Sequence, residues 1–390
     1  MSTQEPSRGF PQAEFEARLE RAQRLMAGAG TDALLLTNEP EVRYFSGFLT
    51  QFWQSPTRPW FVVVPRAGKP IAVIPEIGAP LMRRTWVDDV RTWPAPQPDD
   101  EGISVLAKTL REVGAATGCV GVPMGPETVL RMPLGDYVRL KSALPQTTWT
   151  DATALIRDLR MVKSDAEIAK IAHICAIASD AFRAVPDMAF AGQPLAQTFR
   201  AFKTMLLQGG ADDVPYLVGG AGPGGYADVI SPPSVRPLRT GDVLMMDTGA
   251  VHDGYFCDFD RNYAIGRADD ASRRAYDTLY RATEAGLRAA CPGSTCAGLF
   301  QVMQAVIAAD GYEAGNVGRF GHGLGMQLTE WPSHRQGDGT VLKPGMVITL
   351  EPGLTIGPDR SMVHEENIVV RAGGAQLLSH RATPELPTVG

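Results

Sequence analysis

The sequence has no apolar run long enough to cross a membrane as a helix, because none approaches the roughly 20 residues that such a span needs. Cysteine is scarce: the chain has five in 390 residues, and neither their odd number nor their spacing fits a paired metal motif. The N-terminal stretch MSTQEPSRGFPQAEF lacks the basic and then apolar layout of a signal peptide. We therefore expect a soluble protein of the reducing cytoplasm.

Basic clusters are missing as well. Lys and Arg total 37 against 43 Asp and Glu, which gives a net charge of -6 and no block suited to nucleic acid or anionic membranes. Apolar residues make up 44% and charged residues 21%, which are ordinary globular values. A chain of 390 residues predicts two domains rather than one. The expected partner is a small molecule, not a nucleic acid or a membrane.

Helix and strand patterns alternate in the first part of the chain. Apolar residues recur at helical spacing between Phe10 and Ala29, and the strand-like segments DALLLT and WFVVVPRAGKPIAVIPE follow. Near residue 160, Ser164 and Glu167 have the spacing of a capping box at a helix start. Further helical stretches are predicted at 194–208, 270–290 and 297–310. We expect an α/β domain at 1–158 and an α+β domain at 159–390.

A pair of aspartates marks the first candidate site. Residues 241–266, GDVLMMDTGAVHDGYFCDFDRNYAIG, form two apolar runs around His252-Asp253-Gly254, which predicts a hairpin. Asp247 would then face Asp258 across the two strands. Two carboxylates so close repel each other unless one takes a proton or a cation lies between them. The alternative is a pair of solvated turn or edge acids.

Three later residues add to this pair. Glu351 ends an apolar strand directly before Pro352, whose ring forces the preceding residue into an extended conformation. A second predicted strand, in MVHEENIVV, carries Glu366. Strands that bury Val363 and Ile368 leave little room for unpaired acids, so these glutamates need a cation. Glycines at 321, 323 and 325 would let the backbone pack closely around His322, which would supply a nitrogen ligand.

Together, Asp247, Asp258, His322, Glu351 and Glu366 resemble the ligand set of the pita-bread metalloenzymes, which include Xaa-Pro aminopeptidases, prolidases and methionine aminopeptidases. TNEPEVRYFSGF resembles the start of the creatinase-type N-terminal domain, and LRMVKSDAEI the entry to the catalytic domain. The resemblance implies a creatinase-like α/β domain followed by an α+β pita-bread domain. It also implies a homodimer in which a loop of the N-terminal domain reaches the partner's site, so that Trp53 and Arg58 become candidate substrate contacts.

The resemblance assigns each ligand a role. Asp258 and Glu366 would bridge two divalent ions. Asp247 would complete the coordination of one ion, and His322 and Glu351 would complete that of the other. Oxygen-rich ligands with one nitrogen favour Mn or Fe, with Co or Zn as alternatives. Such a pair of ions gives a bridging hydroxide that attacks an amide bond, and Glu351 would accept or return the proton.

Several positions depart from the prolidase pattern. Thr329 stands where a second histidine follows the metal histidine by seven residues, and Ile230 aligns with another auxiliary histidine. Asp260 replaces a threonine after Asp258, and His364 stands where prolidases usually have Arg. We count Glu351, Thr329 and His364 as candidate catalytic residues, and Asp260 and Trp331 as candidate substrate contacts. An extra acid with one basic group fewer favours a cationic or amine-bearing ligand.

Three hypotheses follow. The first is a dinuclear metal hydrolase of the Xaa-Pro peptidase type, acting on a small or dipeptide-like substrate. The second is a non-peptidase on the same scaffold that acts on a small cationic substrate, as in ectoine hydrolases, creatinases or the dimethylsulfoniopropionate lyases, which Glu330-Trp331-Pro332 also resembles. The third is a non-catalytic binding protein.

Overall fold

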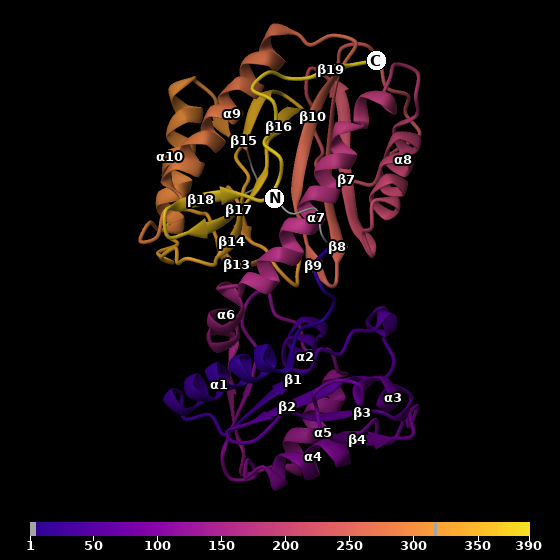
Figure 1. The fold of residues 1–390 in the computed structure, drawn as a ribbon, viewed down its shortest axis with the longest axis vertical. Helices are drawn as coiled ribbons and strands as arrows, with labels where there is room; N and C mark the ends of the chain where they lie inside the picture. The colour runs from indigo at the N-terminus through magenta and orange to yellow at the C-terminus, as the bar shows by residue number, and fades with distance from the viewer. Residues whose placement is uncertain (1–4, 316–317) are drawn as a thin grey trace. The chain divides into compact units, whose positions relative to one another are not determined.

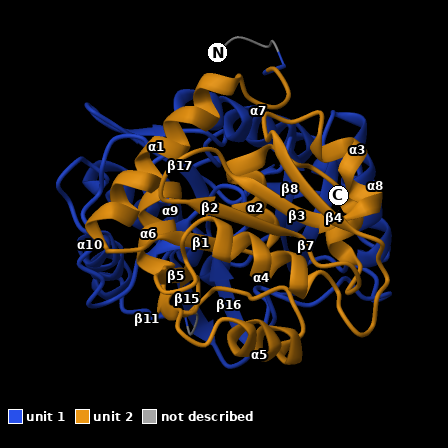
Figure 2. Ribbon diagram, turned by 90° about the horizontal axis from the view of Figure 1, so that it is seen from below, with its two compact units in different colours: residues 1–6, 161–390 blue, residues 7–160 orange. Residues whose placement is uncertain are grey.

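The computed structural model describes residues 5–315 and 318–390. The chain forms two compact units, one of Ser7–Arg160 and one of Met161–Gly390 together with the N-terminal segment up to Pro6 (Figure 2). Among the described residues, no helix has both the length and the apolar character needed to cross a membrane.

The N-terminal unit, indigo to purple in Figure 1, is built on one mixed sheet. Its strand order is β4-β3-β2-β1-β5-β6. Strand β1 pairs antiparallel with β2 and parallel with β5. Leu35, Val63 and Leu106 lie fully buried in the core beside this sheet. The elements are α1 (Gln12–Gly28), β1 (Ala33–Leu36), α2 (Glu39–Ser46), η1 (Gln51–Gln54), β2 (Phe61–Pro65), β3 (Ile71–Pro75), η2 (Glu76–Gly78), α3 (Ala79–Met82), β4 (Asp89–Trp93), α4 (Ile103–Glu112), β5 (Cys119–Val122), α5 (Leu134–Ala143), β6 (Thr148–Asp151) and α6 (Thr153–Met161).

The C-terminal unit contains three antiparallel or mixed sheets with the orders β19-β10-β8-β7, β11-β15-β16 and β13-β12-β14-β17-β18. Helix α7 packs on β8 and α8 on β7, while α9 contacts β14, β15, β16 and β18 and pairs with α10 (Figure 1). The elements are α7 (Asp165–Arg183), η3 (Val185–Asp187), α8 (Leu195–Gln208), β7 (Asp213–Pro223), β8 (Asp242–His252), β9 (Tyr255–Phe256), β10 (Phe259–Ile265), α9 (Asp270–Ala289), α10 (Cys296–Ala309), β11 (Glu313–Ala314), β12 (His322–Gly323), β13 (Glu330–Ser333), β14 (Val347–Leu350), β15 (Gly353–Gly357), β16 (Arg360–Val363), β17 (Glu366–Arg371), β18 (Gly374–Leu377) and β19 (Thr388–Val389).

The local signals for the helices are confirmed. Ser164 is the N-cap of α7, and its hydroxyl and the Glu167 carboxylate each accept a hydrogen bond from the other residue's backbone N–H, as a capping box requires. The predicted helices at 194–208, 270–290 and 297–310 are α8, α9 and α10, within one residue at each end. Periodicity and caps were sufficient here because each helix buries one continuous face.

The predicted hairpin is present, but its register differs from the expectation. Val251 pairs with Phe256 and His252 with Tyr255 around Asp253 and Gly254, both of which have a positive φ as a two-residue turn requires. Continuing this register places Asp247 directly opposite Asp260. The expected partner of Asp247, Asp258, lies diagonally instead. Since alternate residues of a strand share a face, all three carboxylates lie on one side of the hairpin.

Candidate metal centre

The hairpin supplies three carboxylates that are buried together. Asp247 lies inside β8, Asp260 inside β10, and Asp258 directly before β10. The Asp258 backbone is fixed to β17 by Asn367, whose side-chain oxygen accepts from the Asp258 N–H at 2.9 Å and whose amide donates to the Asp258 carbonyl. Asp260 Oδ1 accepts from the backbone N–H of Glu365 at 3.2 Å. These bonds place the acidic face of β10 against the start of β17.

A second sheet supplies an imidazole. His322 lies on β12, where its Nδ1 is 2.9 Å from the Gly323 carbonyl and its Nε2 is 3.4 Å from Asp258 Oδ2. The flanking glycines are needed, as expected: a Cβ on Gly321 would lie 2.3 Å from the Thr349 carbonyl oxygen, and one on Gly323 would lie 2.2 Å from that of Trp331. Because the carbonyl fixes Nδ1, the Nε2 atom is the one presented to the carboxylates.

Asp258, His322 and Glu365 form a group in which one ligand atom of each lies within 4.8 Å of the others. Glu351, directly after β14, is close enough to Asp247 and Asp258 for their charges to affect each other's ionisation. The structure therefore brings together four of the five expected ligands, which are Asp247, Asp258, His322 and Glu351. Two further carboxylates, Asp260 and Glu365, lie with them, and Glu365 was not among the expected site residues.

Glu366 lies apart from the acidic group in this structure, and its expected role as a metal ligand stays a prediction. Its Oε1 accepts from Arg381 (3.1 Å) and the backbone N–H of Ala382 (2.9 Å), and its Oε2 accepts from Arg261 (2.9 Å) and the Ser379 hydroxyl. Neighbouring residues at the start of a strand point to opposite faces, so Glu365 faces the acidic group when Glu366 faces the arginines. Each carboxylate oxygen of Glu366 already accepts two hydrogen bonds, whereas Glu365 lies beside Asp258 and His322.

The pKa values of Glu365 and Glu366 shift in opposite directions. Burial would raise the pKa of Glu366, but Arg261, His364 and Arg381 outweigh it and lower that pKa to about 2. For Glu365, burial raises the pKa well above its usual value, and the charges of Glu351 and Asp258 raise it further. Glu366 is thus a structural anion with its own counter-charges, whereas Glu365 belongs to a site with excess negative charge.

The other buried acids show the same excess. Burial raises the pKa of Asp247 to about 7, and burial with the nearby Asp247 charge raises that of Glu351 to about 8. Burial and Asp247 also hold the pKa values of Asp258 and Asp260 well above the usual range. Asp247 Oδ1, Asp260 Oδ2 and Glu365 Oε1 are buried without a hydrogen-bond partner among the residues that the structure describes. Buried oxygens in this state are stabilised by a cation.

Arg319 is a functional candidate that the sequence analysis missed. Its guanidinium donates to Thr329 Oγ1 at 3.4 Å and to Ser333 Oγ at 3.5 Å. Burial raises the pKa values of Asp258 and Glu351, and the Arg319 charge opposes that rise. The Arg319 charge therefore lies beside the acidic group, next to Thr329. The only signal in the sequence was its position three residues before His322.

Other expected site residues lie elsewhere. His364 is buried behind the site, where its Nδ1 is 2.9 Å from Thr283 Oγ1 of α9 and its Nε2 is 3.4 Å from Arg381. Burial lowers its pKa to about 3. His364 thus lies with Glu366 rather than with the acidic group, and its expected catalytic role stays a prediction. Trp331 packs half-buried against the core of the C-terminal unit, and Ile230 is exposed.

The two N-terminal candidates lie in a loop held by an arginine. Arg131 donates to the backbone carbonyls of Trp53 and Ser55, and its guanidinium lies 5.1 Å from the centre of the Trp53 ring. Arg58 has a φ of 59°, and its guanidinium lies 5.4 Å from the Phe52 ring centre. These contacts give the loop a defined shape, and the roles of Trp53 and Arg58 stay predictions.

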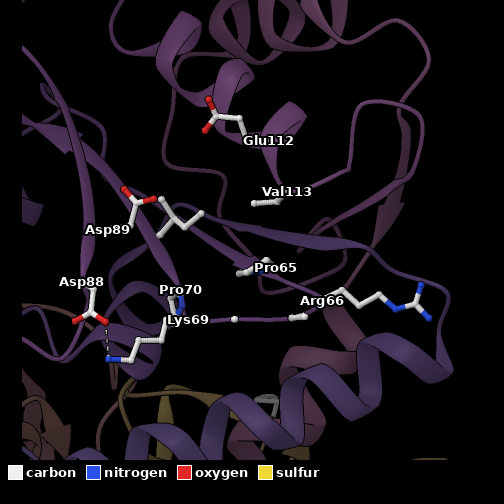
Figure 3. Close-up of a pocket in the computed structure, with 11 residues that line it drawn as sticks. Pro65, Arg66, Lys69, Pro70, Asp88, Asp89, Glu112 and Val113 are labelled. Carbon is white, nitrogen blue, oxygen red and sulfur yellow. Dashed lines mark ion pairs between the residues drawn. The ribbon is translucent and has the colours of Figure 1, made fainter.

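The N-terminal unit also has an open pocket of about 690 Å³, lined by residues that include Arg66, Lys69, Asp88 and Glu112 (Figure 3). Lys69 pairs with Asp88 at 2.8 Å, Arg66 points away from the other labelled side chains, and Glu112 pairs with Arg91. Its charges are already compensated, so this pocket is a weaker functional candidate than the acidic group.

Comparison with known proteins identifies the family. The model of metallopeptidase family M24 matches residues 169–372. The chain belongs to metallopeptidase family M24. The creatinase/prolidase N-terminal domain matches residues 18–162, so this M24 protein has the expected creatinase-like domain followed by the pita-bread domain. The resemblance and the fold class are both confirmed.

The relatives are peptidases. "Probable dipeptidase PepE" of Mycobacterium tuberculosis is 28% identical over 376 residues, which cover 93% of this chain and 94% of that protein. "Xaa-Pro dipeptidase" of Pyrococcus furiosus is 30% identical over 231 residues, covering 58% and 65%. The crystal structure of dipeptidase PepE from Mycobacterium ulcerans superposes with a TM-score of 0.84 at 28% identity, covering 98% and 99%. The prolidase from Pyrococcus horikoshii has a TM-score of 0.80 at 23% identity, covering 94% and 99%, and shows the fold alone.

Membership of the M24 family implies divalent metal ions, and the residues present fit them. The group offers carboxylate oxygens and one imidazole nitrogen, and three of its buried oxygens lack a hydrogen-bond partner within the described part of the chain. Like charges at this density require cations for stability.

Proposed function

We propose that this M24 protein hydrolyses the amide bond of a dipeptide or a similarly small substrate, with two divalent metal ions as cofactors. The observation that carries the proposal is the convergence of buried carboxylates, three of whose oxygens lack a hydrogen-bond partner, around His322 Nε2. The names of the M24 relatives, which are dipeptidases and Xaa-Pro dipeptidases, support the same substrate class.

We assign the ligands on this geometry. Asp247, Asp258, His322, Glu351 and Glu365 would hold the two ions. When bound, the ions supply an activated water as the nucleophile and polarise the scissile carbonyl. The predominance of oxygen ligands favours Mn or Fe over softer metals. Glu351 follows β14 directly, where it can take the proton of the attacking water and return it to the leaving amine.

Arg319 and Thr329 replace the second histidine in this proposal. The Thr329 hydroxyl oxygen accepts from Arg319, so its own proton is available for a different acceptor. A substrate carbonyl that gains negative charge in the transition state is such an acceptor. The Arg319 charge adds to this stabilisation. The group of acids is therefore not matched solely to a cationic substrate, and hydrolysis of a neutral amide is favoured.

Asp260 supports a second candidate function. Its buried Oδ2 has no hydrogen-bond partner among the described residues, and it lies opposite Asp247. A carboxylate in this position suits the amine or cationic group of a small non-peptide substrate. Replacing Asp260 by Thr, the usual residue of prolidases, would raise turnover of Xaa-Pro dipeptides if the natural substrate is a cation. It would lower turnover if Asp260 serves dipeptide binding.

A direct test begins with metal-free protein. Mn²⁺ is restored, bound metal is counted by mass spectrometry, and a panel of dipeptides with and without proline at the second position is assayed. Two ions per chain with dipeptide turnover support the proposed function. Two ions without turnover of any dipeptide favour the second candidate. Fewer than one ion per chain would refute metal dependence.

We also propose a cytoplasmic homodimer in which Trp53 and Arg58 of one subunit contact the substrate of the other. Support comes from the fixed shape that Arg131 gives to their loop. Mixing an Arg58→Ala chain with an Asp258→Asn chain tests this. Activity recovered on mixing supports a shared site, and inactive mixtures of chains that do form dimers contradict it.

A further inference from the structure

A second group of metal-ligating side chains lies in the C-terminal unit, away from the acidic group. Glu5 of the N-terminal segment, His173 of α7 and His252 at the end of β8 each offer one ligand atom, and these atoms lie within 4.8 Å of one another. Ligands bonded at about 2.1 Å to a tetrahedral ion are separated by roughly 3.4 Å. Small side-chain movements would therefore bring all three onto one cation.

This group is distinct from the M24 centre. His252 lies five residues beyond Asp247 on β8, which corresponds to about 16 Å along a strand. An odd number of residues along a strand also reverses the side-chain direction, so His252 and Asp247 point to opposite faces. Helix α7, which carries His173, packs on β8.

The two histidines are held in position by the surrounding structure. Their ring centres are 4.6 Å apart with the rings tilted by 68°, and His252 is fully buried. Two polar contacts fasten the hairpin to α7: Lys170 Nζ lies 2.7 Å from Asp253 Oδ2, and the Tyr255 hydroxyl donates to Glu167 Oε1 at 2.9 Å. The imidazole pair is therefore arranged before any ion binds, which lowers the entropy lost on binding.

The local charge also favours a cation. Asp212 accepts the backbone N–H of Asp253 at 2.6 Å, next to His252 in the sequence, Asp253 pairs with Lys170, and Glu167 accepts from the Tyr255 hydroxyl. The Glu5 carboxylate adds a further acid within 4.8 Å of the two histidine ligand atoms. A divalent ion would offset this charge.

We propose that Glu5, His173 and His252 form a separate site for a borderline divalent ion such as Zn²⁺. Two imidazoles and one carboxylate suit Zn²⁺, Co²⁺ or Ni²⁺, whereas the oxygen-rich M24 centre suits harder ions. The ion fastens the N-terminal segment at Glu5 to α7 and β8. A water fills the fourth position, as in other sites with three protein ligands.

The test counts Zn²⁺ in chains that carry no affinity tag, because a polyhistidine tag would bind the same ion. Metal-free protein is loaded with Zn²⁺ and separated from free ion, and metal per chain is measured by mass spectrometry. Glu5→Gln and His173→Gln are compared with wild type. His380→Gln serves as the matched control, because His380 is exposed and lies outside both groups.

Wild type and His380→Gln are expected to hold one more Zn²⁺ per chain than His173→Gln and Glu5→Gln. Even the residues that support metal ligands are worth about 10- to 100-fold in affinity, so losing a ligand should weaken this site by about 100-fold or more. With Co²⁺, the strong visible absorption of a four-coordinate centre should disappear in both variants. Equal Zn²⁺ counts and equal Co²⁺ spectra in all four proteins would overturn the proposal. Glu5 is exposed, so its variant stays informative even if His173→Gln fails to fold.

Discussion

Glu365→Gln and Glu366→Gln make the same chemical change, from carboxylate to amide, at neighbouring residues. The structure predicts opposite effects of the two substitutions on stability and on metal binding. Glu366 is fully buried and is the shared counter-ion of Arg261 and Arg381, whose side chains are only 10% and 16% exposed. Removing its charge leaves two largely buried guanidinium groups without a partner. Breaking a buried ion pair in this way costs about 3 to 5 kcal/mol. Glu366→Gln should therefore lower the free energy of unfolding by about this amount with or without metal.

Glu365→Gln should not destabilise the metal-free protein. Glu365 Oε1 has no hydrogen-bond partner among the described residues, and the charges of Glu351 and Asp258 disfavour its ionisation. Neutralising it relieves repulsion, so the free energy of unfolding of metal-free protein should be unchanged or higher. The same change removes a proposed metal ligand and should prevent the binding of at least one ion.

The assay combines urea unfolding, followed by tryptophan fluorescence at pH 8 in chelator, with metal counts by mass spectrometry after Mn²⁺ is restored. Glu365→Gln should unfold at the wild-type urea concentration or higher and hold less Mn²⁺. Glu366→Gln should unfold at a lower concentration yet retain Mn²⁺ when folded. The reverse outcome, with metal lost in Glu366→Gln and stability lost in Glu365→Gln, would refute the assignment.

Three further predictions concern the same site. Burial raises the pKa of Asp247 to about 7, and burial is also the main reason that the pKa of Glu351 rises to about 8. Both carboxyl groups therefore stabilise the metal-free fold below about pH 4, and this stability is lost as the pH rises through the two raised pKa values. The melting temperature of chelator-treated protein should thus fall between pH 5 and 8, and saturating Mn²⁺ should abolish the fall; a flat profile in chelator would contradict the raised pKa values. Thr329→Val should lower kcat by about 10²-fold or more while Thr329→Ser retains it, because the hydroxyl is the proposed donor to the substrate oxygen; steady-state kinetics would disprove this role if both variants kept wild-type kcat. Arg319→Met should lower kcat without weakening Mn²⁺ binding, since removing a cation beside the carboxylates cannot disfavour metal, and Arg319→Lys should recover part of kcat; loss of Mn²⁺ in Arg319→Met would instead indicate a structural role.

Much of the site follows from local patterns in the sequence. The Asp253-Gly254 turn, the apolar strand before Glu351 and the glycines around His322 each impose their geometry on the nearest residues, and each is present in the structure. The partner of Asp247 was assigned incorrectly because it depends on the exact centre of the turn. A shift of one residue at the turn moves the opposite position by two, from Asp258 to Asp260.

Arg319 could not be assigned from its neighbours in the sequence. It lies three residues before His322, just ahead of the glycines that flank this histidine, where the pattern indicates only a loop. Its place beside Thr329 results from the pairing of β12 with β13, in which His322 aligns with Ser333 and Gly323 with Glu330. A charge that acts across two strands becomes visible only when their register is known.

Which of Glu365 and Glu366 faces the acidic group also depends on the neighbouring strands. Hydrophobic alternation assigns a face when one side of a strand is exposed, but β17 is buried on both sides, with Asn367, Ile368 and Val369 all inaccessible. Either glutamate therefore fits the local pattern. What decides is the neighbouring strand: on β10 the side chains alternate, so Asp260 points to the acidic group and Arg261 to the opposite side, where it meets Glu366. The cation that neutralises Glu366 comes from this chain, and that arrangement leaves Glu365 facing the acidic group, where we propose that it binds a metal.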